Sequence, residues 1–308
     1  MADLIDVHAH FLTERYVAEA SRSGHALPDG MPAWPTWSAE RHLRLMDDNG
    51  IAKAVLSVSS PGVHLGDDTA AAELARHVND SAAEVAARFP GRFGSFAALP
   101  LPDVGAALAE LARALDELGA DGVALESNVE GRYLGDPLFT PLLEELDRRG
   151  AVAFVHPTSP RGWEAVSPDR PRPMLEFPFD TTRTVADLLF SGALERFPGI
   201  GFVIPHCGGT LALLADRIEL FRTTFTSGGG APTRDQLRGL WFDLAGTPFP
   251  AQVPALASVV GTGKLLYGSD FCFTPPEAVA RQLASIDGAP GADWRELTTR
   301  NAERLLGR

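Results

Sequence analysis

The chain has 308 residues, of which 45% are hydrophobic and 22% are charged, and its formal net charge at pH 7 is −13. This length and composition fit a single soluble (β/α)₈ barrel, and the negative charge argues against nucleic acid or an anionic membrane as a partner. Cys207 and Cys272, without a CxxC motif, predict a reducing cytoplasm. Neither a signal-peptide pattern nor an apolar run of about 20 residues is present, so no membrane segment is expected.

Short apolar segments and longer amphipathic segments alternate along the chain. Eight segments are typical of buried parallel strands, because most are continuous apolar runs such as AVAFVH and IGFVIPH. They cover residues 4–10, 54–59, 93–99, 122–127, 152–156, 201–206, 240–244 and 265–270. Helices are expected over residues 39–49, 68–89, 103–118, 137–149, 181–197, 209–225, 251–260, 275–286 and 293–306. Asp103 and Asp293 are expected helix caps, and Gly50 and Gly150 are expected helix ends.

These eight strand–helix units predict a TIM barrel, formed as one domain over residues 1–308. A doubly wound open sheet is the alternative fold. In a barrel, the carboxyl ends of all strands share one face, and active sites are built on that face.

Two connections are longer than a compact domain usually needs. Residues 12–38 follow the first strand and contain Pro and Trp, which favours an ordered flap over disorder. Residues 158–180 follow the fifth strand and are also rich in Pro. In a barrel both lie on the active-site face. Four aromatic side chains in them are candidates for a pocket that holds an aromatic ring, with core packing as the alternative for each: Trp34, Trp37, Phe177 and Phe179.

Five chemically active side chains fall at the expected carboxyl ends of strands. His8 and His10 end the first strand, where residues two apart point to the same face. The fifth, sixth and eighth strands end at His156, His206 and Asp270. Imidazoles and a carboxylate on one rim predict a divalent transition metal, with Zn²⁺ expected and Mn²⁺ or Fe²⁺ also compatible. For Asp270 alone, capping of the following turn is the alternative.

Other polar side chains near strand ends are weaker candidates. Asp243, near the end of the seventh strand, either faces the site or caps its own loop. Glu126 and Asn128 flank the end of the fourth strand. Arg217 lies in the helix after the sixth strand, and the pattern alone indicates a solvated arginine.

Four motifs occur in an order that spans nearly the whole chain: DVHAHF at 6–11, FVHPT at 154–158, PHCGGTLALLADRI at 205–218 and YGSDF at 267–271. With them the sequence resembles the amidohydrolase superfamily, in the branch of aminocarboxymuconate-semialdehyde decarboxylase and the salicylate- and resorcylate-type decarboxylases. The segments GHALPDGMPAWPTW and PRPMLEFPFDTTRT are most similar to 6-methylsalicylate decarboxylases.

This resemblance implies a role for each rim residue. His206 would act in catalysis beside the metal, and Arg217 matches an arginine that reaches a neighbouring subunit's site, which implies a homodimer. The aminocarboxymuconate enzyme holds a carboxylate with an arginine in the first long loop. The corresponding part here, GMPAWPTW, has no arginine, so the metal is expected to be the main group that holds the carboxylate. Salicylate- and resorcylate-type enzymes often have Glu at the position of His8. The implied metal ligands are His8, His10, His156 and Asp270.

Lysine is scarce, since only Lys53 and Lys264 occur, and both precede strands. Binuclear amidohydrolases commonly bridge two metals with a carboxylated lysine at the carboxyl end of a middle strand. The two lysines here are expected at the opposite end of the barrel. The site is therefore expected to hold one metal, unless Glu126 substitutes for the lysine.

The expected function is non-oxidative decarboxylation of an aromatic acid, of the hydroxybenzoate or 6-methylsalicylate kind. Asp270 or His206 would donate the proton that replaces the carboxylate. The alternative is a metal-dependent hydrolase of a lactone or amide, because the same ligands can activate water. A hydratase or dehydratase is the third possibility.

Overall fold

The computed structural model describes residues 4–166, 169–225 and 230–307. Eight parallel strands form one sheet in chain order. Two parallel bridges, from Asp6 to Tyr267 and from Ala9 to Phe271, close the sheet into a barrel. This confirms the (β/α)₈ barrel, since a doubly wound sheet would order its strands differently. The strands are β1 (Leu4–His10), β2 (Ile51–Ser57), β3 (Phe93–Ala98), β4 (Gly122–Glu126), β7 (Val152–His156), β8 (Gly201–Ile204), β9 (Trp241–Asp243) and β10 (Leu265–Leu266), and a separate hairpin joins β5 (Asn128–Val129) to β6 (Arg132–Tyr133).

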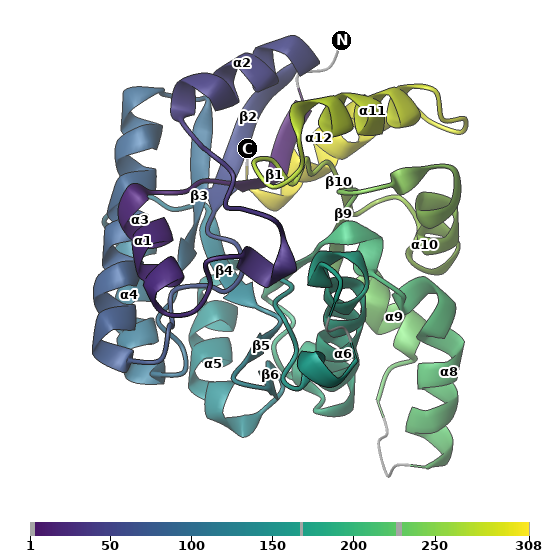
Figure 1. Cartoon of the computed structure of the whole chain (residues 1–308). Coiled ribbons are helices and arrows are strands. Elements are labelled where there is room, and N and C mark those ends of the chain that lie inside the picture. Colours follow the sequence, from purple (N-terminus) through teal and green to yellow (C-terminus); the bar gives the residue numbers. More distant parts are fainter. Residues whose placement is uncertain (1–3, 167–168, 226–229, 308) are drawn as a thin grey trace.

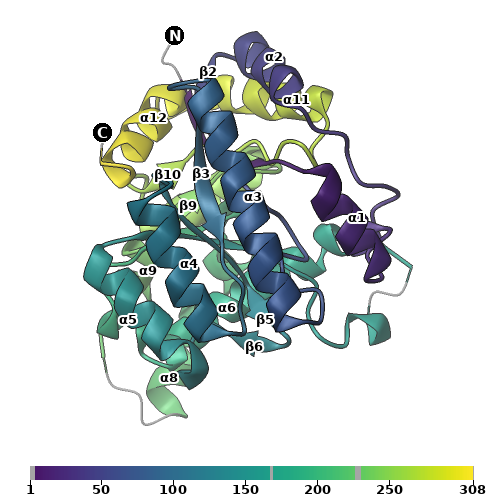
Figure 2. The same ribbon diagram turned by 90° about the vertical axis from the view of Figure 1, so that its left-hand side faces the viewer.

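Helices surround the barrel (Figure 1), and α3, α4 and α5 lie side by side along one flank (Figure 2). Among the described residues, no helix is both long enough and apolar enough to cross a membrane. The helices after the first are α2 (Ala39–Asn49), α3 (Asp68–Arg88), α4 (Val104–Asp116), α5 (Thr140–Arg149), α6 (Glu176–Phe190), α7 (Ala193–Arg196), α8 (Leu211–Thr224), α9 (Thr233–Arg238), α10 (Val253–Val260), α11 (Pro276–Asp287) and α12 (Trp294–Leu305).

Local sequence signals fix several helix ends. Asp103 caps α4 by accepting a hydrogen bond from the backbone N–H of Ala106, and Asp293 caps α12 in the same way. Gly50 and Gly150 end α2 and α5 in the left-handed conformation, with φ of 68° and 59°. These caps and ends confirm the expectations from the sequence.

Residues 12–38, expected as a flap, contain the helix α1 (Glu14–Arg22). Thr13 caps this helix by accepting a hydrogen bond from the backbone N–H of Tyr16. The Tyr16 side chain is buried, and its hydroxyl donates to the carbonyl of Ser59 just after β2. A helix of 9 residues is too short to be stable alone, so these tertiary contacts hold it.

Six strands end one to four residues earlier than expected. Among them, β8 ends at Ile204 and β10 at Leu266, before His206 and Asp270. His206 and Asp270 have φ of 54° and 58°, a left-handed conformation that a strand cannot contain. His206 and Asp270 therefore stand on turns just past the strands, whereas His8, His10 and His156 lie within strands.

One expected helix is divided in two. The segment 181–197 is expected as a single helix, but α6 begins at Glu176 and a separate α7 follows it. Gly192 separates the two helices because its φ is 72°, outside the range of a right-handed helix. Residues 137–149 begin with a 3₁₀ turn (Pro137–Phe139) before the regular helix.

Aromatic side chains in the barrel interior pack against one of the site histidines. Phe154 on β7 is fully buried and stacks on Phe96 of β3, with ring centroids 5.6 Å apart. Its ring also meets the His8 imidazole edge-on, at 4.9 Å. The two cysteines, Cys207 and Cys272, are buried in the larger core between sheet and helices, as expected for packing residues.

Both lysines lie toward the amino ends of the strands. Lys53 Nζ is 2.9 Å from Asp121 Oδ1, just before β4, and Lys264 donates to the carbonyl of Gly239, before β9. This places them away from the rim on which the histidines lie, as the sequence predicts.

Candidate metal centre

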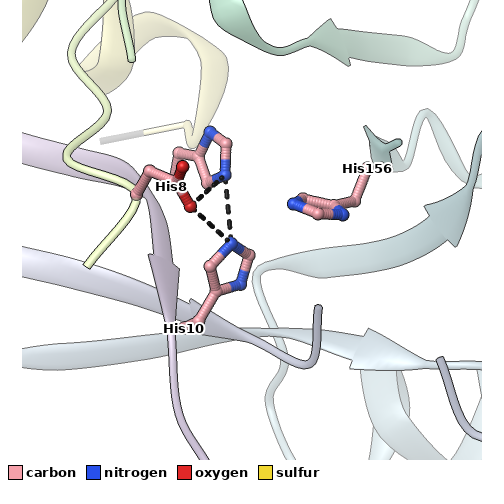
Figure 3. A group of neighbouring side chains, drawn as sticks. His8, His10 and His156 are labelled. Carbon is pink, nitrogen blue, oxygen red and sulfur yellow. Dashed lines mark hydrogen bonds and ion pairs between the residues drawn. The ribbon is translucent and has the colours of Figure 1, made fainter. Parts of the chain in front are cut away.

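Four of the expected site residues meet at the carboxyl ends of the strands (Figure 3). His8, His10, His156 and Asp270 each offer one ligand atom, and these atoms all lie within 4.8 Å of one another. His8 Nε2 lies 3.1 Å from His10 Nε2. Asp270 Oδ1 is 3.2 Å from His10 Nε2 and 3.5 Å from His8 Nε2. All three histidines are buried.

Backbone hydrogen bonds join Asp270 to β1. The Asp270 N–H donates to the carbonyl of His8 at 2.8 Å, and the His10 N–H donates to the carbonyl of Phe271. Asp6 Oδ1 accepts from the N–H groups of both His8 and Ser269, at 3.1 and 3.0 Å. These bonds hold Asp270 in its left-handed conformation, which costs an ordinary residue of the order of 1–3 kcal/mol.

Asp243 orients the first ligand histidine. Its Oδ2 lies 2.8 Å from His8 Nδ1, which directs His8 Nε2 into the site. Its Oδ1 accepts from the N–H groups of His206 and Ala245, both at 2.9 Å. The sequence leaves open whether Asp243 faces the site or caps its own loop, and the structure shows both roles. Oδ2 faces the site, and Oδ1 caps the loop.

Close packing requires a glycine at position 268, beside His8 and Asp243. A Cβ on Gly268 would lie 2.7 Å from His8 Cβ, closer than such atoms approach, and a tight 3.1 Å from Asp243 Cγ. The second ligand histidine is oriented in a similar way, since His10 Nδ1 lies 3.3 Å from the carbonyl and 3.1 Å from the hydroxyl of Ser57.

The pKa shifts of the four side chains are compatible with the binding of a cation. Burial lowers the pKa of His10 and, further, that of His156, so both are neutral imidazoles with a lone pair to donate. Burial alone would raise the pKa of Asp270, but the neighbouring histidines hold it well below its usual range. Burial also opposes a charge on His8, yet Asp243 and Asp270 raise its pKa to about 10.

The negative charges of Asp243 and Asp270 therefore favour a positive charge at His8. A divalent cation compensates the same negative charges, and its ligands release protons when it binds. Three nitrogens and one oxygen are a common ligand set for zinc with a position left for water or substrate. The residues present therefore fit a single divalent metal.

A family model described as amidohydrolase matches residues 5–308. The chain belongs to the amidohydrolase family. The amidohydrolase is 37% identical over 302 residues to decarboxylase yanB of Aspergillus niger, which covers 93% of this chain and 82% of the relative. It is 36% identical over 286 residues to the 6-methylsalicylic acid decarboxylase of Penicillium expansum, with 90% and 87% covered. A crystal structure of amidohydrolase II matches with a TM-score of 0.92 at 32% identity, over 99% of this chain and 100% of that one. The resemblance drawn from the motifs is confirmed.

His206 lies at the edge of the amidohydrolase's four-residue cluster. Its Nε2 is 3.4 Å from Asp270 Oδ2, the oxygen that faces away from the ligand histidines. The turn that presents it needs Gly209, since a Cβ there would lie 2.2 Å from the carbonyl of Pro178. Within the described chain, the His206 side chain contacts Asp270, and its ring centroid lies 5.0 Å from that of His8.

One of the four aromatic candidates, Phe177, contacts a residue of the cluster, and Trp34 reaches the cluster only through Phe273. The buried Phe177 ring meets His156 edge-on at 6.0 Å. Trp34 packs against Phe273, whose ring is 5.6 Å from His10. Trp37 lies one layer further out, where its indole N–H donates to His42. Phe179 is 41% exposed at the start of α6.

Arg217 is exposed on α8, with its guanidinium 4.9 Å from the ring centroid of Phe221. Among the described residues it has no contact with the metal ligands or with His206. Within one chain the structure therefore places it outside the site, and its expected role depends on a neighbouring subunit.

A cavity of about 580 Å³ is lined by the ends of β2, β3 and β4 and by both long segments. None of the four cluster residues is among its described lining residues, but Glu126, the neighbour of His156 in the strand register, is. None of the four aromatic candidates is among its described lining residues. Arg172 lines it, stacks 3.8 Å above Trp163 and donates from Nε to Ser159. No motif in the sequence marks Arg172 or Trp163 as a cavity residue, because only the packing of the long segments against one another places these side chains at the cavity. Glu126 also lines the cavity, and burial with the charges of Asp29 and Asp180 raises its pKa.

Proposed function

We propose that this amidohydrolase is a carboxy-lyase that removes CO₂ from a hydroxybenzoic acid such as 6-methylsalicylate. The convergence of His8, His10, His156 and Asp270 at one point supports this proposal. Relatives at 36–37% identity that cover most of the chain are decarboxylases, and one acts on 6-methylsalicylic acid. The proposed substrate and mechanism come from this similarity together with the geometry of the site.

We propose that these four side chains hold one zinc ion, with manganese as the alternative metal. Such a cation would supply a positive centre that binds acidic oxygens and stabilises negative charge. Since neither lysine lies at the rim, the chain offers no lysine to bridge a second ion.

Asp270 and His206 form the proposed proton path. Asp270 Oδ1 faces the ligand histidines, while Oδ2 lies 3.4 Å from His206 Nε2. A proton on His206 can pass to Asp270 and then to the ring carbon that bears the carboxylate. The bond between that carbon and the carboxylate then breaks, and CO₂ leaves as the ring becomes aromatic again. The carboxylate is replaced by hydrogen, so the reaction needs one proton and no oxidant.

Phe177 and Trp34 are the proposed apolar neighbours of the substrate ring. Phe177 is buried beside His156, and Trp34 reaches the site through Phe273. Trp37 and Phe179 would contribute less, since one lies behind the first layer and the other is exposed.

We place this activity in a single cytoplasmic domain. The family match spans residues 5–308, and strands from both ends of that range form one barrel. Cys207 and Cys272 are both buried and unpaired, as is common where thiols stay reduced.

A panel of acids and lactones tests the proposed reaction. Incubation of the zinc-loaded protein with 6-methylsalicylate and related hydroxybenzoates is expected to release CO₂ and the corresponding phenol, without nicotinamide or oxygen. Gas release and chromatography of the product measure this. Hydrolysis of lactones or amides with no turnover of any acid would replace the decarboxylase proposal with the hydrolase alternative.

We further propose that the protein is a homodimer joined through α8. This helix exposes Leu213 and Leu220 to 79% and 52%, and their spacing puts them on the same side as Arg217. Exposed apolar side chains in such a row indicate a protein interface. Figure 1 shows α8 at the periphery, where a second copy can reach it.

The double substitution Leu213→Asp and Leu220→Asp is expected to convert a dimer into a monomer, because two charges would be buried without partners in the interface. Light scattering coupled to size exclusion measures the mass. Leu138→Asp, at another exposed apolar position, is the control and should leave a dimer intact. A parent protein that is already monomeric contradicts the proposal.

A further inference from the structure

Two buried polar atoms without a hydrogen-bond partner lie opposite one another beside the metal centre. They are His156 Nδ1 and Glu126 Oε2, which have no partner among the described residues and are 3.9 Å apart. A buried polar group left without a partner costs about 1–3 kcal/mol. Two such groups facing one another therefore require an explanation.

The fold places this pair together. Glu126 ends β4, His156 ends β7, and the two residues are direct neighbours in the parallel register of these strands. Gly62 leaves space for the carboxyl group, since a Cβ there would lie 3.1 Å from both Cγ and Oε1 of Glu126. The Glu126 side chain is 17% exposed, and its free oxygen is buried on the side of His156.

The other two ligand histidines show what is missing at His156. His8 Nδ1 has the carboxylate of Asp243 at 2.8 Å, and His10 Nδ1 has the carbonyl of Ser57 at 3.3 Å. Each acceptor fixes the ring so that Nε2 points into the site. In Figure 3 one ring nitrogen of His156 also points toward His8 and His10. Its Nδ1 is the only one of the three without such an acceptor among the described residues.

We propose that Glu126 is the positioning residue for His156, accepting a hydrogen bond from its Nδ1–H. This inference depends on the proposed role of His156 as a metal ligand. A movement of about 1 Å brings the two atoms to hydrogen-bond distance. The bond selects the tautomer that offers Nε2 to the metal and restricts rotation of the ring.

This role differs from that of a metal-bridging carboxylate. The cluster of possible ligands found in the described chain contains His156 and not Glu126. Glu126 lies beside Nδ1 of that ring, so it would act through His156 rather than bind a second ion.

Metal affinity of the full-length protein tests the proposal. Zinc is removed and then returned in competition with a chromophoric chelator. Glu126→Ala is expected to weaken zinc binding by about 10–100-fold, as loss of a partner behind a ligand histidine commonly does. Glu126→Gln should recover part of the affinity, because its amide oxygen still accepts a hydrogen bond. Glu164→Ala removes an exposed carboxylate from the same cavity and should leave the affinity unchanged.

A purely structural role predicts a different result. The melting temperature of the metal-free protein would fall, while zinc affinity of the folded protein stayed at the parent value, and this overturns the proposal. If Glu126→Ala does not fold, zinc affinity is measured for Glu126→Met instead. This variant keeps the length of the side chain but removes the hydrogen-bond acceptor. Zinc binding that depends on Glu126 in a protein that decarboxylates no acid would refute the proposed reaction and leave this inference standing.

Discussion

Replacing Asp270 with asparagine is expected to lower decarboxylation by about 10²–10⁴-fold, the range for loss of a general acid. The neutral amide removes the negative charge that lies 3.2 and 3.5 Å from the Nε2 atoms of His10 and His8. It also interrupts the path from His206, whose Nε2 lies 3.4 Å from Oδ2. The parent should contain about one metal ion per chain and the variant less. Steady-state CO₂ release and elemental analysis measure both quantities.

Two further variants separate the two roles of Asp270. His206→Asn is expected to keep the metal and lose turnover, because His206 contacts Asp270 Oδ2 rather than the ligand nitrogens. Asp48→Asn changes an exposed carboxylate on α2 and should alter neither quantity. A stable content of two ions per chain, or full turnover by the Asp270 variant, is incompatible with the proposed site.

Gly268→Ala is expected to destabilise the metal-free protein by about 1–3 kcal/mol, the usual cost of forcing an extra methyl group into a packed core. The new Cβ would lie 2.7 Å from His8 Cβ and 3.1 Å from Asp243 Cγ. Both side chains are fully buried, so neither can move aside into solvent. Relief of the contact would separate His8 from Asp243 and should weaken metal binding as well.

Urea unfolding of the metal-free variant and parent measures this difference in the free energy of unfolding. Gly263→Ala is the matched control, because no atom lies within 4 Å of its added Cβ. That exposed position should change the free energy of unfolding by no more than about 0.5 kcal/mol. Equal unfolding midpoints for the Gly268 and Gly263 variants would show that the site tolerates the methyl group.

The sequence by itself predicted the barrel and the four residues of the candidate metal site. Parallel strands covered on both faces need continuous apolar runs, which remain visible without any structure. His8 and His10 stand two residues apart on such a run, and His156 ends another, so their common rim follows from the alternation of strands and helices. Local caps such as Asp103 were also readable, because a cap acts on residues only three positions away.

Only the tertiary structure decided what holds those ligands in place. Asp243 supports His8, Ser57 supports His10, and Glu126 lies beside His156. Each partner comes from a different strand, and strand register and side-chain packing, rather than local spacing, decide which atoms meet. The left-handed turns at His206 and Asp270 depend likewise on distant contacts, because an ordinary residue adopts that conformation only when its surroundings hold it there.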